Sequence, residues 1–184
     1  NLAGLIVPQQ EQAYKTNNKS LLDNALQLNN TAEFQRHIQN RKLTVLLADA
    51  TRDLPTEDCL TAIIPLLATC KAVQFILCTG THTAQTKENI ELSTAIQKIW
   101  DQYYTHPIEI LIHDCKQAKF IDAGITSRGT AVRYNAAIEE SDVFLVFSDV
   151  KPHYFAGYSN PVKNFVPGIC DYETARGNHS LTLD

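Results

Sequence analysis

Two short segments of the chain combine residues that could bind an anion or move a proton. The segment 49–53 reads Asp-Ala-Thr-Arg-Asp, and an arginine fork there could grip a carboxylate or phosphate while Asp49 orients it. A purely structural Asp49–Arg52 ion pair explains the same residues equally well. The second segment, Gly80-Thr81-His82, places a histidine that could exchange protons near neutral pH after a glycine that permits a tight turn. A structural role is the more common one for a lone histidine in that position.

A third, longer segment runs from Lys151 to Gly168 and is the densest in reactive side chains. It contains His153, Ser159 and Lys163 within a loop of the length that often carries function. A lysine there could act as a nucleophile if its pKa were lowered. An ordered surface loop with a solvated lysine is the alternative interpretation.

Several familiar motifs are absent, which removes whole classes of site. There is no G-x-G-x-x-G, H-E-x-x-H or zinc-type Cys/His pairing. The segment Gly124–Thr130 has the glycine spacing of a phosphate-binding P-loop but lacks its lysine, so we reject that interpretation. The five cysteines are odd in number and include no C-x-x-C pair. This favours reduced thiols and a cytoplasmic protein over a disulfide framework.

The elements that must position these residues alternate between strands and helices. Helices are expected after Thr56, which could cap the first of them, and over residues 86–100. Buried or extended strands are predicted over residues 43–48, 73–78, 108–112, 131–134 and 143–147. This order predicts an α/β fold, a mostly parallel sheet flanked by helices in a Rossmann-like three-layer sandwich. The polar segments 49–53, 80–83 and 148–163 would then meet at the carboxyl ends of the strands.

Length and charge set further limits on the protein. With 184 residues, we expect residues 1–184 to form a single domain, with 1–40 as a peripheral helical or polar extension. A net charge of -4 argues against a strongly basic nucleic-acid binder. No apolar run approaches the ~18 residues of a membrane helix, so no membrane partner is expected. A chain that starts at Asn1 and contains no Met is expected to be a trimmed or partial product.

Taken in order, the motifs resemble the N-terminal domain of the nickel-dependent lactate racemases, the nickel-pincer nucleotide racemases and epimerases. The similarity spans residues 43 to 181. The matching motifs are Asp49-x-Thr-Arg52, Gly80-Thr-His82, Gly124-x-Thr-Ser-Arg-Gly-Thr130, Pro152-His-Tyr-Phe-Ala-Gly-Tyr-Ser159, Lys163, Pro167-Gly168 and Asn178-His179. Each motif is weak alone, but the ordered set is specific. The resemblance implies a second, C-terminal domain that this chain lacks, with the site between the two.

The resemblance also implies a role for each matched position. Lys163 would hold the pyridinium-dithiocarboxylic acid mononucleotide covalently, and His179 would be the protein ligand to its nickel ion. His82 and His153 would be the paired acid/base residues in racemisation of a small 2-hydroxy acid through transient hydride transfer. Substrate binding would fall to Arg52 and Asp49. Further cofactor-binding positions would be Thr51, Gly157 and Ser159. Cofactor-synthesis enzymes are the implied partners.

Two positions depart from the pattern of that family. Asn160-Pro161 stands where two glycines are usual before the lysine, and Thr83 stands where arginine often follows the Gly-Thr-His motif. Proline restricts its own backbone and that of Asn160, so the path to Lys163 is expected to differ. A relative that binds a nucleotide or organic acid without nickel is therefore the alternative. A further alternative is that the isolated domain is inert, and we expect little activity from it alone.

Overall fold

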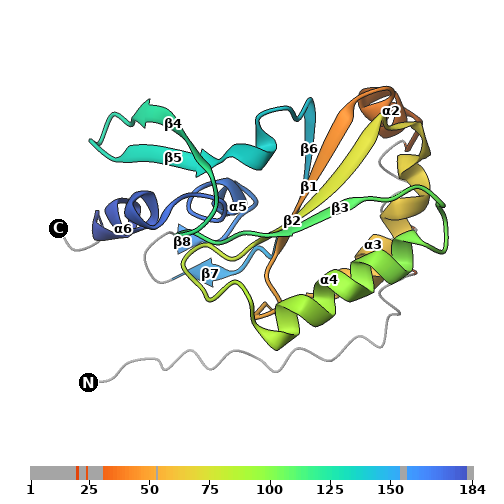
Figure 1. The fold of residues 1–184 in the computed structure, drawn as a ribbon, viewed down its shortest axis with the longest axis horizontal. Coiled ribbons are helices and arrows are strands. Elements are labelled where there is room, and N and C mark those ends of the chain that lie inside the picture. The colour runs from red at the N-terminus through yellow and green to blue at the C-terminus, as the bar shows by residue number, and fades with distance from the viewer. Residues whose placement is uncertain (1–19, 21–23, 25–30, 53, 154–156, 182–184) are drawn as a thin grey trace, which may run out of the picture.

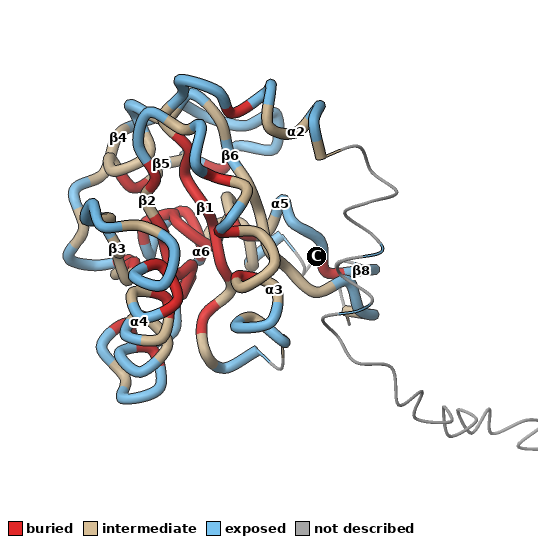
Figure 2. The backbone as a smooth tube through the Cα atoms, turned by 90° about the vertical axis from the view of Figure 1, so that its right-hand side faces the viewer, coloured by how far each residue is buried: buried red, intermediate tan, exposed pale blue. Residues whose placement is uncertain are grey.

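The centre of the fold is a four-stranded parallel sheet. In this computed structural model the described residues are 20, 24, 31–52, 54–153 and 157–181. The sheet consists of β1 (Lys42–Ala48), β2 (Ala72–Cys78), β3 (Glu109–Ile112) and β6 (Val143–Phe147), in the order β3-β2-β1-β6 (Figure 1). All three pairings are parallel. The predicted α/β class is confirmed, and β1 and β2 occupy the buried middle of the sheet (Figure 2).

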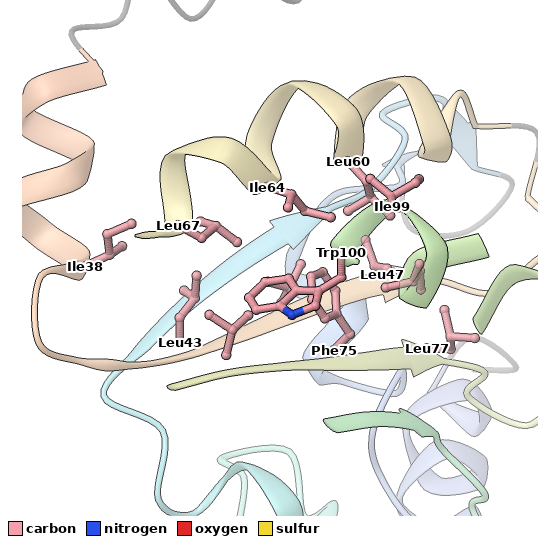
Figure 3. Close-up of a cluster of buried hydrophobic side chains, with 13 residues drawn as sticks. Ile38, Leu43, Leu47, Leu60, Ile64, Leu67, Phe75, Leu77, Ile99 and Trp100 are labelled. Carbon is pink, nitrogen blue, oxygen red and sulfur yellow. The ribbon is translucent and has the colours of Figure 1, made fainter. Parts of the chain in front are cut away.

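Helices cover one face of the sheet and enclose the larger core. They are α2 (Thr31–Ile38), α3 (Thr56–Ile63), the 3-10 helix η1 (Ile64–Thr69) and α4 (Lys87–Trp100). Alternate residues of β1 and β2, such as Leu47 and Phe75, point into this core. Trp100, 1% exposed, lies edge-on to Phe75 with ring centroids 6.2 Å apart (Figure 3). This core anchors the strand ends that carry the polar segments.

The opposite face of the sheet is covered by shorter elements from the C-terminal half. They are the antiparallel pair β4 (Phe120–Ile125) and β5 (Ala131–Asn135), η2 (Ala136–Ile138), the pair β7 (Pro152–His153) and β8 (Gly157–Tyr158), α5 (Val162–Phe165) and α6 (Tyr172–Ser180). Ile169 packs here against Leu46 and Ile76 in a second buried cluster. These elements lie across the sheet from α3 and α4 (Figure 1). The result is the predicted three-layer arrangement.

One local prediction was wrong, and one strand was missed. Thr56 does not cap α3 but is its first residue, because the preceding Pro55 occupies the cap position and makes no side-chain cap bond. The predicted extended piece at 131–134 is confirmed as β5, whose antiparallel partner β4 the sequence did not predict. In contrast, the hydroxyl of Thr86 does cap α4, accepting a hydrogen bond from the backbone of Asn89.

The N-terminal extension is described only in part. Residues 31–38 form α2, which ends at the fully buried Ile38 and packs on the core through it. Most of the predicted extension 1–40 lies outside the described residues, as do the loop residues 154–156. Among the described helices, none is long and apolar enough to span a bilayer.

Candidate functional site

A pocket of about 200 Å³ lies at the carboxyl ends of β1, β2 and β6. Of the residues singled out from the sequence, six line it: Arg52, His82, His153, Ser159, Lys163 and His179. They come from segments far apart in the chain, brought together because the carboxyl ends of parallel strands meet at one edge of the sheet. Asp49, Thr51 and Gly157 do not line the pocket.

Asp49 follows β1 directly and interacts with the histidine of the next loop. Asp49 is 3% exposed, and its Oδ2 lies 2.6 Å from Nδ1 of His82. The hydroxyl of Thr51 donates to the other carboxylate oxygen over 2.7 Å. A carboxylate can only accept, so Nδ1 of His82 carries the proton of this bond and Nε2 is left as the basic nitrogen. Asp49 and Thr51 therefore hold His82 rather than facing the pocket.

Arg52 does not form the structural ion pair with Asp49 that the sequence allowed. The contact between these two residues is a backbone one, from the Arg52 amide to the Asp49 carbonyl at 3.1 Å. The Asp49 carboxylate is bound by Thr51 and His82 instead, and Arg52 lines the pocket. This placement favours the anion-gripping interpretation of the segment.

Lys163, His153 and His179 lie together around the pocket. Burial, reinforced by the Arg52 guanidinium, lowers the pKa of Lys163, while Asp149 opposes the shift. Burial and then Lys163 lower the pKa of His179. Burial, followed by repulsion from Lys163, Arg52 and His179, lowers the pKa of His153. Each shift favours the uncharged form of its group, which is the form that acts as a base, nucleophile or metal ligand.

Asp149 and Lys151, just after β6, are pocket residues inside the predicted polar segment 148–163 to which the sequence assigned no role. Their side chains form an ion pair of 2.5 Å, and this pairing lowers the pKa of Asp149. Their position directly after a predicted strand was the available signal. Ser159 secures the same turn, because its hydroxyl donates to the Asp149 carbonyl at 3.1 Å and accepts from the Lys151 amide at 3.0 Å. Gly157 lies on the exposed β8 with φ of 76°.

The unusual pair Asn160-Pro161 immediately precedes α5, the short helix that contains the pocket residue Lys163. The side chain of Asn160 accepts from the Val162 amide at 2.9 Å, and its carbonyl accepts from the Lys163 amide at 3.0 Å. Pro161 has φ of -55°, which suits the first turn of a helix, where its missing N–H costs nothing. Lys163 therefore reaches the pocket without the two glycines of the resembled family.

The described residues offer no complete set of protein ligands for a metal. Across residues 31–52, 54–153 and 157–181, no group of three or more His, Cys, Asp or Glu side chains could hold an ion. A metal bound here would need most of its ligands from another molecule. His179 would supply one imidazole, from the last turn of α6.

The comparisons with known proteins agree with the fold and the motifs. A lactate racemase of Lactiplantibacillus plantarum is 25% identical over 167 residues, which are 86% of this chain and 37% of that protein. A second, from Thermoanaerobacterium thermosaccharolyticum, is 21% identical over 143 residues, 76% of this chain and 32% of the relative. The chain thus spans about a third of the length of these relatives.

A solved structure shows the same fold. The lactate racemase apoprotein from Thermoanaerobacterium thermosaccharolyticum superimposes with a TM-score of 0.68 at 19% identity, covering 88% of this chain and 39% of that one. The family profile described as "Lactate racemase N-terminal domain" matches residues 1–184. The resemblance seen in the motifs is confirmed, and the chain belongs to the family of lactate racemase N-terminal domains.

Proposed function

We propose that the complete protein is a racemase or epimerase of a small 2-hydroxy acid, such as lactate, that uses a nickel-pincer nucleotide. One observation supports this above all: Lys163, His179, His82 and His153 line a single pocket, although they come from separate segments. The two curated relatives named above are both lactate racemases. The second domain of the family would close the pocket.

The residues of the pocket fit the cofactor. Lys163, with its lowered pKa, offers the amine for a covalent link, and His179 offers one imidazole to a metal that has its other ligands within the cofactor. Arg52 gives the pocket a positive charge that suits an anionic group, whereas the charge of Lys151 is paired with Asp149. When bound, the nickel-pincer nucleotide supplies a centre that accepts and returns a hydride.

The two histidines would exchange the protons of the reaction. His82, held by Asp49 with Nε2 as its basic nitrogen, would take the hydroxyl proton from one enantiomer and return it in the reverse direction. His153, from the loop after β6, would do the same for the other enantiomer. Its lowered pKa keeps it largely neutral near pH 7. The Arg52 fork would hold the substrate carboxylate between them.

The proposal includes a cytoplasmic location for the protein. All five cysteines are unpaired thiols. Reduced cysteines fit the cytoplasm, where cofactor-synthesis enzymes would act on Lys163.

The mass of the complete protein tests the proposal. After co-expression with cofactor-synthesis enzymes, we expect a covalent adduct that a Lys163→Ala variant lacks and a Lys98→Ala control retains. Lys98 is an exposed residue in the last turn of α4. Racemisation of a 2-hydroxy acid should depend on nickel and accompany the adduct. An unmodified Lys163 together with ligand-induced thermal stabilisation that needs no nickel would instead support the cofactor-free relative.

A further inference from the structure

Asn89, in the first turn of α4, joins the two loops that carry the Asp49–His82 pair. Its side-chain oxygen accepts from the Ala50 amide at 2.9 Å, one residue beyond Asp49. Its side-chain nitrogen donates to the Ala84 carbonyl at 2.9 Å, two residues beyond His82. The same nitrogen lies 3.5 Å from the Thr83 carbonyl. One amide thus connects the loop after β1 to the loop after β2.

The orientation of this amide is determined by its partners. A backbone N–H must face the oxygen and a backbone carbonyl must face the nitrogen, so a flipped amide would lose the bonds on both sides. Asn89 is 1% exposed, which removes water as a substitute partner. The backbone amide of Asn89 makes a separate bond to the Thr86 hydroxyl at 3.2 Å. Changing the side chain therefore leaves the cap of α4 in place.

We propose that Asn89 is a positioning residue of the racemase, holding the two loops at the separation that the Asp49–His82 hydrogen bond requires. This rests on the proposed function in assigning His82 to proton transfer. Asn89 itself does not line the pocket, so it acts through the two loops. A carboxylate–imidazole bond of 2.6 Å tolerates little displacement of either loop.

Two variants of the complete protein separate positioning from simple stability. Asn89→Ala removes all the side-chain bonds, and the isosteric Asn89→Asp keeps the acceptor for Ala50 but presents a carboxylate to the Ala84 carbonyl. Asn135→Ala is the matched control, since Asn135 is another buried asparagine with bonds on both ends, to His113 and to Ala137, and with none to the residues that Asn89 binds.

The readout is the nitrogen NMR spectrum of His82, which reports which ring nitrogen carries the proton. We expect the Nδ1–H form of His82 in the parent and in Asn135→Ala, and its loss in both Asn89 variants. Where racemisation is measurable, kcat/KM should fall by about 10- to 100-fold in the Asn89 variants, as for small misplacements of catalytic groups. If Asn89→Ala does not fold, the His82 spectrum of Asn89→Asp alone tests the positioning role.

Two results would overturn the inference. One is an unchanged His82 spectrum in the Asn89 variants, and the other is an equal change in Asn135→Ala. A parent protein without racemase activity would refute the proposed function, yet the His82 spectrum would still decide on the positioning role.

Discussion

The Asp49 carboxylate lies 2.6 Å from Nδ1 of His82 and links the ends of two neighbouring strands. Asp49 follows the last residue of β1, and His82 lies four residues beyond the end of β2. The acid is buried and its second oxygen is bound by Thr51, so it is held in place before any ligand arrives. The pair sets both the direction and the tautomer of the His82 ring, and each can be tested.

Asp49→Asn should damage turnover far more than binding. The amide can present its NH2 group to Nδ1 of His82, which forces the proton onto Nε2 and removes the basic nitrogen. We expect kcat to fall by about 10²- to 10⁴-fold, as in other enzymes whose orienting acid is replaced. KM should change little, because Asp49 does not line the pocket. Chiral separation of the products measures the rate, with the exposed Asp122→Asn as control. A kcat within twofold of the parent would contradict this role.

Lys163 should react as an amine at lower pH than an exposed lysine. Burial and the Arg52 charge lower its pKa, whereas Asp149 raises it. Arg52→Gln should therefore move the onset of Lys163 acylation to higher pH, and Asp149→Asn should move it to lower pH. Mass spectrometry of the cofactor-free complete protein, labelled over a pH series, measures this with Lys98 as internal reference. Shifts of both variants in the same direction would contradict the charge assignment.

Much of the site could be predicted because the carboxyl ends of parallel strands lie at one edge of the sheet. Segments 49–53 and 80–83 each follow a buried strand, and the structure places them side by side through Asp49 and His82. Lys163 is identified as a site residue by its place in the ordered set of motifs. The direction of Asp49, toward His82 and not Arg52, depends on a contact 33 residues apart that no local spacing encodes.

The features that the sequence did not predict correctly also have local causes. The β4 strand, Phe120–Ile125, is mostly exposed and contains Gly124 at a register shift, so it lacks the apolar alternation by which strands are found. Thr56 has the chemistry of a cap, but Pro55 takes that position. Asn89 is a polar residue within a predicted helix, and the sequence around it does not indicate that its side chain binds the loops after β1 and β2.

Gly168 should tolerate no side chain. A Cβ there would lie 2.3 Å from the Asn164 carbonyl oxygen, beside Lys163, so the backbone must move. Gly168→Ala should destabilise the protein by about 1–3 kcal/mol, in the range of other overpacking changes. Gly177→Ala is the matched control, since its Cβ would lie 3.4 Å from the Thr130 methyl group and its helical position gains ~1 kcal/mol from alanine. Urea denaturation measures both. Equal effects of the two changes would contradict the steric argument.

His113 should make folding sensitive to acid. It is fully buried: Nε2 donates to the Cys170 carbonyl at 2.9 Å, and Nδ1 accepts from the Asn135 amide at 3.1 Å. The Asn135 oxygen accepts from Ala137, so the amide cannot turn to receive a second proton. Burial accordingly lowers the pKa of His113, despite opposing contributions from the Cys170 carbonyl and Asp114.

A histidine whose pKa is lower in the folded than in the unfolded state takes up protons on unfolding. Its contribution to stability is therefore complete above the unfolded pKa of about 6.5 and declines as pH falls below it. Urea denaturation between pH 8 and 5 should show a shallower loss of unfolding free energy for His113→Asn than for the parent. His153 and His179 add slopes of the same sign, so the difference between the two proteins isolates His113. A His113→Asn slope as steep as the parent's would show that His113 is protonated without cost.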